Sequence, residues 1–472
     1  MGLLGLAGLT SLENGSRSVT ARGGEPNIDP TAPMRARVPD FQPTATNVIV
    51  IYLVGGPSHI DTFDHKPALT ELDGQAVPDS IRSAVEATRF ANVFHGADDK
   101  LMASPYGFRQ YGEMGMWVSE LHPHLARHVD RMSFIHSLQA ESNNHAPASY
   151  QWHTGEVRSG KASFGSWVTY GLGSENDNLP GYVLLFDAGP LGGSANYTNG
   201  FLPAAFQPTR FKDHGPPLFD LVPPDELAAG QQRTFELIGR LDRIHRAQRA
   251  AATDLDARIA AYELAYRMQH AALEVGDLTG EPAYVRSSYA IDAPEGRLAS
   301  FGRKCLRLGD SSNEACDSCS FTTCRTRTVG TLMATSSRIT RLELGGPINP
   351  PRRCSTIWLS AGLLDSTLVV WISEFGRTPM MQGDRGRQHN AAGFTCWLAG
   401  GGVVPGQRIG ATDEIGLMAI ERPIAFRDLH ASILTALGID FEALSFPVAG
   451  RDERLTGVAG MAHPIDGLLR TS

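Results

Sequence analysis

A hydrophobic segment that ends in two glycines constrains the fold more than any other feature of the chain. Residues 47–54 read Asn-Val-Ile-Val-Ile-Tyr-Leu-Val, and Gly55 and Gly56 follow directly. Eight mostly apolar residues, several of them β-branched, are typical of a strand buried on both faces, as in a parallel sheet. Glycines then allow a turn that residues with a Cβ make only at a cost. The segment therefore predicts a central strand of an α/β sheet.

Two acidic residues, Asp61 and Asp64, lie just beyond this predicted strand. In open α/β sheets, ligands and metals bind outside the carboxyl ends of the strands. The alternative is a surface loop whose acidic side chains are only solvated. The motif by itself leaves both interpretations open.

A second predicted strand, Ser366–Ser373, also ends in an acid, Glu374, and His389 follows in the loop beyond it. Divalent cations in proteins need converging carboxylates and imidazoles. We therefore interpret Asp61, Glu374 and His389 as candidate metal ligands. For each acid the alternative is a helix cap or a turn residue.

Strand-like and helix-like segments alternate along the rest of the chain. Residues 132–138 and 182–186 have the composition of strands, residues 224–275 that of amphipathic helices, and residues 428–438 that of a helix ending in glycine. Such alternation is typical of a parallel sheet covered on both faces. We predict one α/β domain over residues 46–472, with a helical insertion at residues 215–300.

Charge and composition exclude some classes of protein. The 472 residues are 42% hydrophobic and 19% charged, as in an ordinary globular protein. The formal net charge of −8, without runs of Lys or Arg, argues against nucleic acid as a partner. No apolar stretch approaches the length of a transmembrane segment.

The first ten residues, Met-Gly-Leu-Leu-Gly-Leu-Ala-Gly-Leu-Thr, resemble the hydrophobic part of a secretory signal without its charged region. Residues 11–45 are rich in Pro, Ser, Thr and Gly, as in a linker. We interpret residues 1–45 as the remnant of an export signal, of the twin-arginine type, followed by a linker. The protein is then expected in the periplasm or cell envelope. The alternative is a poorly ordered tail.

Residues 306–358 break the pattern. Four of the six cysteines lie there, among many Ser, Thr and Arg residues without helical or strand periodicity. The Cys316-Asp-Ser-Cys319 pair allows a zinc or disulfide knot, but a zinc knuckle needs a second pair.

A frameshift explains this segment better. Permissible codons for Gly309–Arg341, read in a shifted frame, encode a helix end, a buried strand and an Asp-x-His pair. The lost Asp and His fall where Thr331 and Met333 now stand. We therefore expect residues 306–358 to be irregular, poorly packed and largely exposed, and the sheet to lack a central strand. Thr331 and Met333 should offer no ligand, whereas Asp61, Glu374 and His389 should still converge.

Several motifs together resemble the bacterial family catalogued as domain of unknown function 1501. They span residues 46–457 and are Gly55-Gly-Pro-Ser-His-Ile-Asp-Thr-Phe-Asp-His-Lys-Pro67, Asn144-His-Ala-Pro-Ala148 with Thr154-Gly155, Ser373-Glu-Phe-Gly-Arg-Thr-Pro379, Gly386-Arg-Gln-His-Asn390 and Asp428-Leu-His-Ala-Ser-Ile-Leu434. That family looks like a branch of the alkaline phosphatase and sulfatase superfamily. The resemblance implies a three-layer sandwich with a mostly parallel central sheet and one or two divalent metals at its strand ends.

The resemblance also implies roles for individual residues. Asp61 matches the acid after the first strand, and His389 matches a histidine in the loop after the second. Glu374 falls where the superfamily has the sequence Asp-His-Gly. Phe375 therefore replaces a histidine that is a metal ligand in the superfamily. His145 stands at the nucleophile position ahead of Thr154-Gly155. A histidine there can ligate metal or form a phosphohistidine-type adduct, but a metal-activated water is chemically simpler.

The candidates divide into catalytic and supporting residues. We assign His145 and Arg377 as catalytic, with Arg377 binding either an anionic group or a carbonyl. His59, Asp64 and Asn144 are predicted to orient the ligands. Ser142 and Ser149 are substitute nucleophiles, and His430 is expected to have a packing role.

Two functions follow from these residues. The first is an exported metal-dependent hydrolase of sulfate or phosphate esters, on a small molecule or a polysaccharide, with Zn, Mn or Ca as cofactor and with activity impaired in this chain. The second is a non-catalytic binding protein of the cell envelope that keeps the fold. Metal content and ester turnover, measured together, distinguish them.

The frameshift hypothesis makes the first prediction. Resequencing the gene across the codons for residues 306–358 should reveal a missing or extra base at each side of the segment. An intact open reading frame would contradict the hypothesis, and the Cys-rich run would then be a true insertion.

Overall fold

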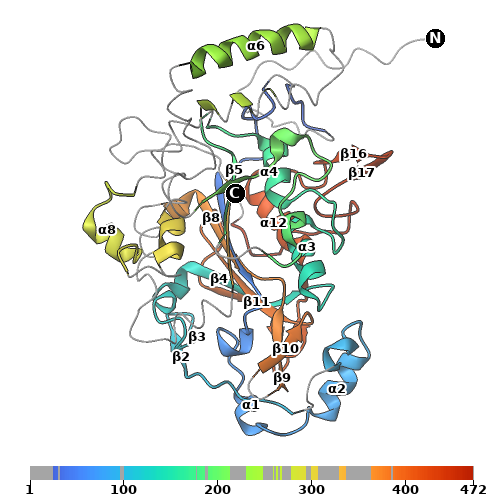
Figure 1. The fold of residues 1–472 in the computed structure, drawn as a ribbon. Helices are drawn as coiled ribbons and strands as arrows, with labels where there is room; N and C mark the ends of the chain where they lie inside the picture. Colours follow the sequence, from blue (N-terminus) through green and yellow to red (C-terminus); the bar gives the residue numbers. More distant parts are fainter. Residues whose placement is uncertain are drawn as a thin grey trace, which may run out of the picture.

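The fold is built on a nine-stranded sheet (Figure 1). The computed structural model describes residues 25–29, 32–95, 100–176, 178–186, 190–212, 230–247, 259, 262–263, 266–267, 278–293, 299–306, 329–335, 363–383 and 386–470. The strands lie in the order β12 (Gln407–Ile409), β4 (Met132–Gln139), β11 (Phe394–Ala399), β8 (Thr367–Ile372), β1 (Asn47–Val54), β7 (Val329–Thr335), β5 (Tyr182–Phe186) and β6 (Thr209–Phe211), and β15 (Ile424–Ala425) pairs with β4.

The sheet is mostly parallel. Neighbouring strands run parallel except at β11, which is antiparallel to both β4 and β8. The carboxyl ends of β1 and β8 therefore lie at the same edge, in a register that pairs Tyr52 with Ile372. This places the segments after both strands side by side.

Strand β1 is central because both of its faces are apolar. Val48, Val50 and Tyr52 belong to one hydrophobic core, whereas Ile49 and Leu53 belong to a second core on the other face. This alternation follows from the two-residue period of a strand. The composition that predicted a fully buried strand is thus explained by two separate cores.

Helices cover one face of the sheet and shorter elements cover the other (Figure 1). The first core contains side chains of α3 (His145–Thr154), α4 (Phe164–Leu172) and α12 (Phe426–Ala436). The second contains side chains of β3 (Met116–Ser119), which pairs with β2 (Phe108–Tyr111), and of the 3-10 helix Leu125–Arg131. The described residues therefore form a mixed α/β fold around one sheet.

Smaller elements surround this sheet. The β9–β10 hairpin (Gly376–Gln382 and Gly386–Asn390) begins just after β8, and α1 (Pro67–Glu71) and α2 (Asp79–Glu86) lie near it (Figure 1). Two further strand pairs are β13–β14 (Ala411–Thr412 and Ala419–Glu421) and β16–β17 (Phe446–Val448 and Arg451–Glu453). Within the predicted helical insertion lie α6 (Gln231–Ala247) and α8 (Ala283–Ser288).

The expectation of a missing central strand is wrong. Val329–Thr335 forms β7, which pairs in parallel with β1 on one side and β5 on the other. The side chains of the segment Val-Gly-Thr-Leu-Met-Ala-Thr are small or apolar, which suits a strand inside a sheet. Its backbone supplies the hydrogen-bond donors and acceptors that both neighbouring strands need. Thr331 and Met333 lie inside the strand, opposite Val50 and Tyr52, and not beyond its carboxyl end. The rest of the predicted irregular stretch, 307–328 and 336–358, lies outside the described residues.

The predicted N-terminal linker also differs from expectation. Residues 1–24 lie outside the described part, but residues 32–45 pack on the domain. Thr44 and Ala45 donate backbone hydrogen bonds to the Ala436 carbonyl, and Ser174 donates one to the Met34 carbonyl. A segment rich in Pro and Thr resembles a linker even where its backbone is hydrogen-bonded to the domain. Amino-acid composition does not show which distant residues a segment contacts.

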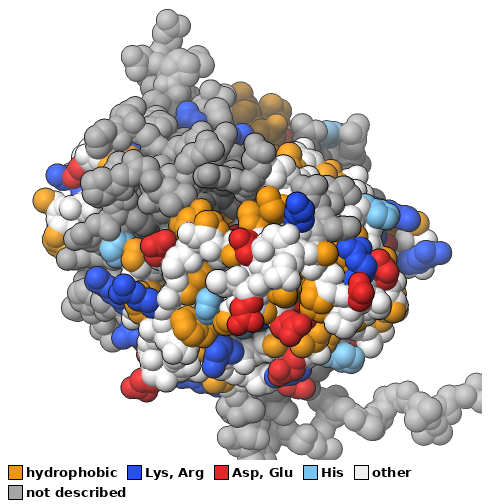
Figure 2. All heavy atoms as spheres, turned by 90° about the horizontal axis from the view of Figure 1, so that it is seen from below, with side chains coloured by type: hydrophobic (Ala, Val, Ile, Leu, Met, Phe, Trp, Pro, Cys, Tyr) orange, Lys and Arg blue, Asp and Glu red, His pale blue; other side chains and the backbone are white. Residues whose placement is uncertain are grey.

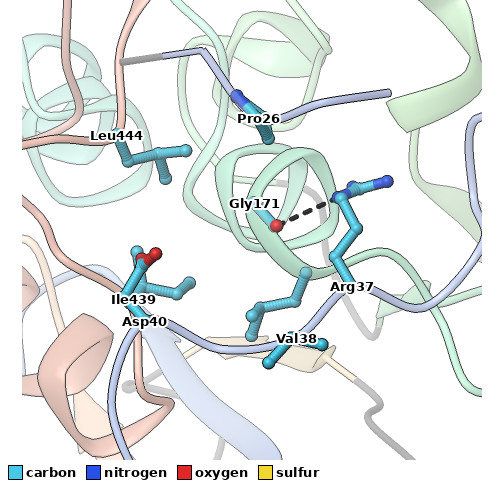
Figure 3. A pocket seen from close by; sticks show the side chains of 8 residues that line it. Pro26, Arg37, Val38, Asp40, Gly171, Ile439 and Leu444 are labelled. Carbon is cyan, nitrogen blue, oxygen red and sulfur yellow. Dashed lines mark hydrogen bonds between the residues drawn. The ribbon is translucent and has the colours of Figure 1, made fainter. Parts of the chain in front are cut away.

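Arg37 anchors this segment to the end of α4. Its guanidinium donates to the carbonyls of Thr169 at 2.7 Å and Tyr170 at 2.6 Å. It also donates to the Gly171 carbonyl at 3.0 Å (Figure 3). These carbonyls belong to the last turn, where intrahelical donors run out and positive charge is favourable. Arg37 and Gly171 also line a hollow together with Val38.

Replacing Arg37 by Ala should therefore destabilise the domain. Several charge-assisted hydrogen bonds are lost, and we expect the free energy of unfolding to fall by about 1–3 kcal/mol. Urea denaturation followed by circular dichroism measures this. Arg35→Ala, at an exposed position two residues away, is the matched control and should change stability little. Equal effects of the two variants would show that Arg37 does not anchor the segment.

Candidate functional site

Glu374 is a buried carboxylate at the carboxyl edge of the sheet, 1% exposed. Its Oε1 accepts hydrogen bonds from the Gly55 amide at 2.7 Å and from Nδ1 of His145 at 2.6 Å. Its Oε2 lies 3.0 Å from the Tyr52 hydroxyl and 2.8 Å from Ser373 Oγ. The partners come from β1, from the turn after it, from α3 and from the end of β8. The parallel register of the strands is what brings them together.

Hydrogen bonds keep this carboxylate ionised. Burial by itself raises the pKa of Glu374, but the hydrogen bond from His145 and further contacts, including Ser373, outweigh it and hold the pKa below its usual range. Burial, and then the neighbouring Glu374 charge, raise the pKa of Tyr52 well above its ordinary value. Tyr52 therefore remains a protonated donor to Glu374.

His145 is the first residue of α3. Asn144 precedes the helix in an extended conformation, and Pro147 in the first turn suits a helix start. Because a carboxylate can only accept, Nδ1–H of His145 donates to Glu374, and whenever the ring is neutral its lone pair is on Nε2. The side chain is 20% exposed, and no described residue is hydrogen-bonded to Nε2. We call His145 and Glu374 the His–Glu dyad.

His389, on β10, lies beside the dyad. Its ring centroid is 4.3 Å from that of His145, and Nδ1–H donates to the Asn143 carbonyl at 2.8 Å. Burial, followed by the nearby Arg377 and His145, lowers the pKa of His389 to about 4, so the ring is neutral near pH 7. The Phe375 ring lies 4.7 Å from both imidazoles and is buried.

The glycine turn makes room for this arrangement. Gly55 and Gly56 have φ of 109° and 69°. A Cβ on Gly56 would lie 2.8 Å from the Phe375 ring, so a larger residue would collide with the side chain beneath the two histidines. Glycine is thus needed here both for conformation and for space.

Arg377 holds the same turn. Its guanidinium donates to the carbonyls of Gly55, Gly56 and Arg387, the last two at 2.9 and 3.1 Å. This corresponds to the carbonyl-binding alternative for Arg377, and the side chain braces the turn against β10.

The structure does not assemble the predicted metal ligands. Asp61 forms a bidentate ion pair with Arg387, with N–O distances of 2.7 and 3.0 Å, so its carboxylate is neutralised. Glu374 is saturated by the donors above, and only His389 retains a free ring nitrogen. Across the described ranges, no group of three or more His, Cys, Asp or Glu side chains is placed to hold a metal ion. The trio Asp61, Glu374 and His389 therefore does not fit a divalent cation.

The residues predicted to orient ligands lie in other contacts. Asp64 pairs with Lys66 at 3.0 Å and accepts from the Thr412 hydroxyl, and His59 Nε2 donates to the Gly416 carbonyl at 2.8 Å. Burial raises the pKa of Asp64, but His136 and Lys66 outweigh it and hold the pKa below its usual value. These contacts tie the Asp61–Asp64 loop to the segment around β13. Asn144 is exposed.

The substitute candidates have structural partners. Ser142 Oγ accepts from the Asn144 amide at 3.1 Å, and Ser149 is buried with Oγ 3.0 Å from the Tyr52 hydroxyl. His430 is buried on the side of the sheet that is covered by α3, α4 and α12. Its ring is stacked on Trp152, and Nε2 donates to the Trp152 carbonyl at 2.7 Å. The packing role expected for His430 agrees with these contacts.

Tyr52, Asn143 and Arg387 were missed by the sequence interpretation. Tyr52 carries the only hydroxyl in an apolar strand, and Arg387 stands two residues before His389 in a recognised motif. Both features could have pointed to these residues. The Asn143 contact uses a backbone carbonyl, which every residue has, so the residue type could not have predicted it.

The surface near this end of the sheet is of mixed charge. Figure 2 shows acidic and basic side chains interspersed over the lower face. Among the described residues, no helix is both long enough and apolar enough to cross a bilayer. The hollow in Figure 3 lies elsewhere, because none of the predicted site residues lines it.

Comparison with known proteins gives one match. The profile of a family described as a protein of unknown function (DUF1501) matches residues 45–308 and 359–469. The match is interrupted within the Cys-rich segment and covers more than half of the chain. A search of curated proteins found no match.

Buried histidines predict acid sensitivity. Burial lowers the pKa of His122, His136, His153 and His430 to about 4 each, against about 6.5 in an unfolded chain. Between these values the unfolded chain binds protons that the folded chain does not. Stability is therefore complete above pH 6.5 and falls as the pH drops, by up to about 1.4 kcal/mol per pH unit for each histidine.

Urea denaturation at constant ionic strength between pH 7.5 and 5 measures this slope. His430→Gln should show a shallower dependence on pH, whatever its absolute stability. A flat profile for the unmodified protein would contradict the protonation argument.

Proposed function

The chain belongs to the DUF1501 family, and we propose that this member is an exported hydrolase of phosphate or sulfate esters in which His145 is the reacting side chain. The observation that carries the proposal is the His–Glu dyad, with its 2.6 Å hydrogen bond between Nδ1 of His145 and a buried, ionised carboxylate.

A dyad of this kind has a defined chemistry. The carboxylate fixes the tautomer that leaves Nε2 unprotonated, orients the ring and stabilises positive charge that develops on it. Nε2 can then take up a proton or attack an electrophilic centre. The 20% exposure of His145 leaves the ring accessible to a substrate, while Glu374 remains shielded from water. His389 adds a second neutral imidazole beside the reacting one.

The substrate class comes from the resemblance to alkaline phosphatases and sulfatases. In that resemblance, His145 corresponds to their nucleophile, ahead of Thr154-Gly155. Small-molecule or polysaccharide esters of phosphate and sulfate are therefore the compounds to test. The apolar N-terminal residues support export, and the proposed location is the periplasm or cell envelope.

The mechanism is derived from the dyad without a metal. Asp61 is neutralised by Arg387 and Glu374 is saturated, so the ligand trio predicted for Zn, Mn or Ca does not fit a cation.

A second candidate function is a non-catalytic envelope binding protein. One observation favours it: the Arg377 guanidinium is held by backbone carbonyls. The resemblance to the superfamily adds that Phe375 would replace a ligand histidine. Binding of esters without turnover across a broad panel would support this candidate. The frameshift hypothesis adds that restoring the reading frame of residues 306–358 should raise turnover of an impaired enzyme.

Glu374→Gln tests the proposed function. The amide keeps the shape of the side chain but removes the charge that stabilises a positive ring, and we expect kcat for aryl phosphate or sulfate esters to fall by about 10²–10⁴-fold. Turnover of chromogenic esters measures this. Glu421→Gln, at an exposed position on β14, is the matched control and should retain full activity. Absence of turnover in both the present chain and a frame-restored chain would refute the proposal.

A further inference from the structure

We propose that Nε2 of His145 is a phosphoryl acceptor, so that phosphate esters react through a covalent phosphohistidine. This inference rests on the proposed function and names both the favoured substrate class and the route. It distinguishes a covalent path from direct attack by water at the same site.

The state of the His145 ring carries the inference. Nδ1–H is committed to Glu374 at 2.6 Å, so in the neutral ring only Nε2 has an available lone pair. The buried carboxylate is held by the Gly55 amide and the Tyr52 hydroxyl, so it cannot turn away from the ring. It can balance the positive charge that the ring acquires when Nε2 forms a bond. Nucleophilicity is thus directed to one atom.

The other candidate nucleophiles near His145 are engaged in different contacts. The hydroxyl of Ser149 is buried against Tyr52, and Ser142 Oγ accepts from the Asn144 amide. His389 directs its Nδ1–H to the Asn143 carbonyl, so it does not compete for the Glu374 carboxylate. His145 is the first residue of α3. The positive end of the helix dipole lies at this end of α3 and favours the negative charge of a phosphoryl group.

The reaction has two steps. In the first, the Nε2 lone pair forms an N–P bond while the P–O bond to the alcohol breaks, and the alcohol oxygen leaves with the electron pair and takes a proton from solvent. In the second, water forms a P–O bond, the N–P electron pair returns to Nε2, and the water releases one proton to solvent. One water is consumed, and the products are the alcohol and hydrogen phosphate.

The His389 side chain serves the second step. Its Nε2 retains a lone pair, and its ring lies 4.3 Å from His145. This nitrogen can therefore accept a hydrogen bond from the attacking water.

The test is direct labelling of the full chain with ³²P-acetyl phosphate, followed by rapid denaturation. We expect a label that is stable in alkali and labile in acid, as an N–P bond is, and that mass spectrometry maps to His145. His145→Gln should abolish the label. Glu374→Gln should slow its formation on the order of 10²-fold. His463→Gln, at an exposed histidine outside the site, is the matched control and should label normally.

Each other outcome overturns the inference. A label that is stable in acid, that maps to another residue, or that is absent from the unmodified chain excludes a phosphohistidine at position 145. Circular dichroism shows whether each variant is folded, and mapping on the unmodified chain does not depend on any variant. Ester turnover without a label would leave the proposed hydrolase function standing and refute only the covalent route. A stable label without turnover would support the acceptor and refute the hydrolase.

Discussion

The burial of one carboxylate organises this end of the molecule. Glu374 has lost its water, and an unpaired buried charge would cost several kcal/mol. Its oxygens are therefore met by Gly55, Tyr52, Ser373 and His145. These residues come from segments that are separated by up to hundreds of positions in sequence. The turn after β1, the start of α3 and the end of β8 are fixed relative to each other because each supplies a donor to the same side chain.

A second charge pair holds the loop after β1. Asp61 and Arg387 are both buried and bind through two parallel hydrogen bonds, while Arg387 also donates to the carbonyls of Met102 and Ala103. Arg377 braces the glycine turn in a similar way. Two arginines of the β9–β10 hairpin thus position the backbone around the dyad. Their charges are used for structure, which distinguishes them from arginines that bind an anionic ligand.

Some elements were predictable because they depend on local composition. The strands around Val50 and Val370 follow from continuous apolar runs, and α12 from an amphipathic pattern that ends near glycine. Glu374 and His389 were identified because they follow a predicted buried strand, whereas His145 was identified from the family resemblance. The β7 strand was missed because Val329–Thr335 has no marked pattern, and only its position between β1 and β5 makes it a strand.

The sequence by itself determined the α/β class, the family and the residue types at the carboxyl edge of the sheet. Only the tertiary structure decided which of those residues act together. Asp61 and Glu374 look alike in sequence, each an acid beyond a buried strand. Asp61 faces Arg387 and is neutralised, whereas Glu374 faces His145 and aligns an imidazole. The chemistry of a carboxylate is set by the partner that reaches it within hydrogen-bond distance, and that partner is chosen by strand register and helix placement.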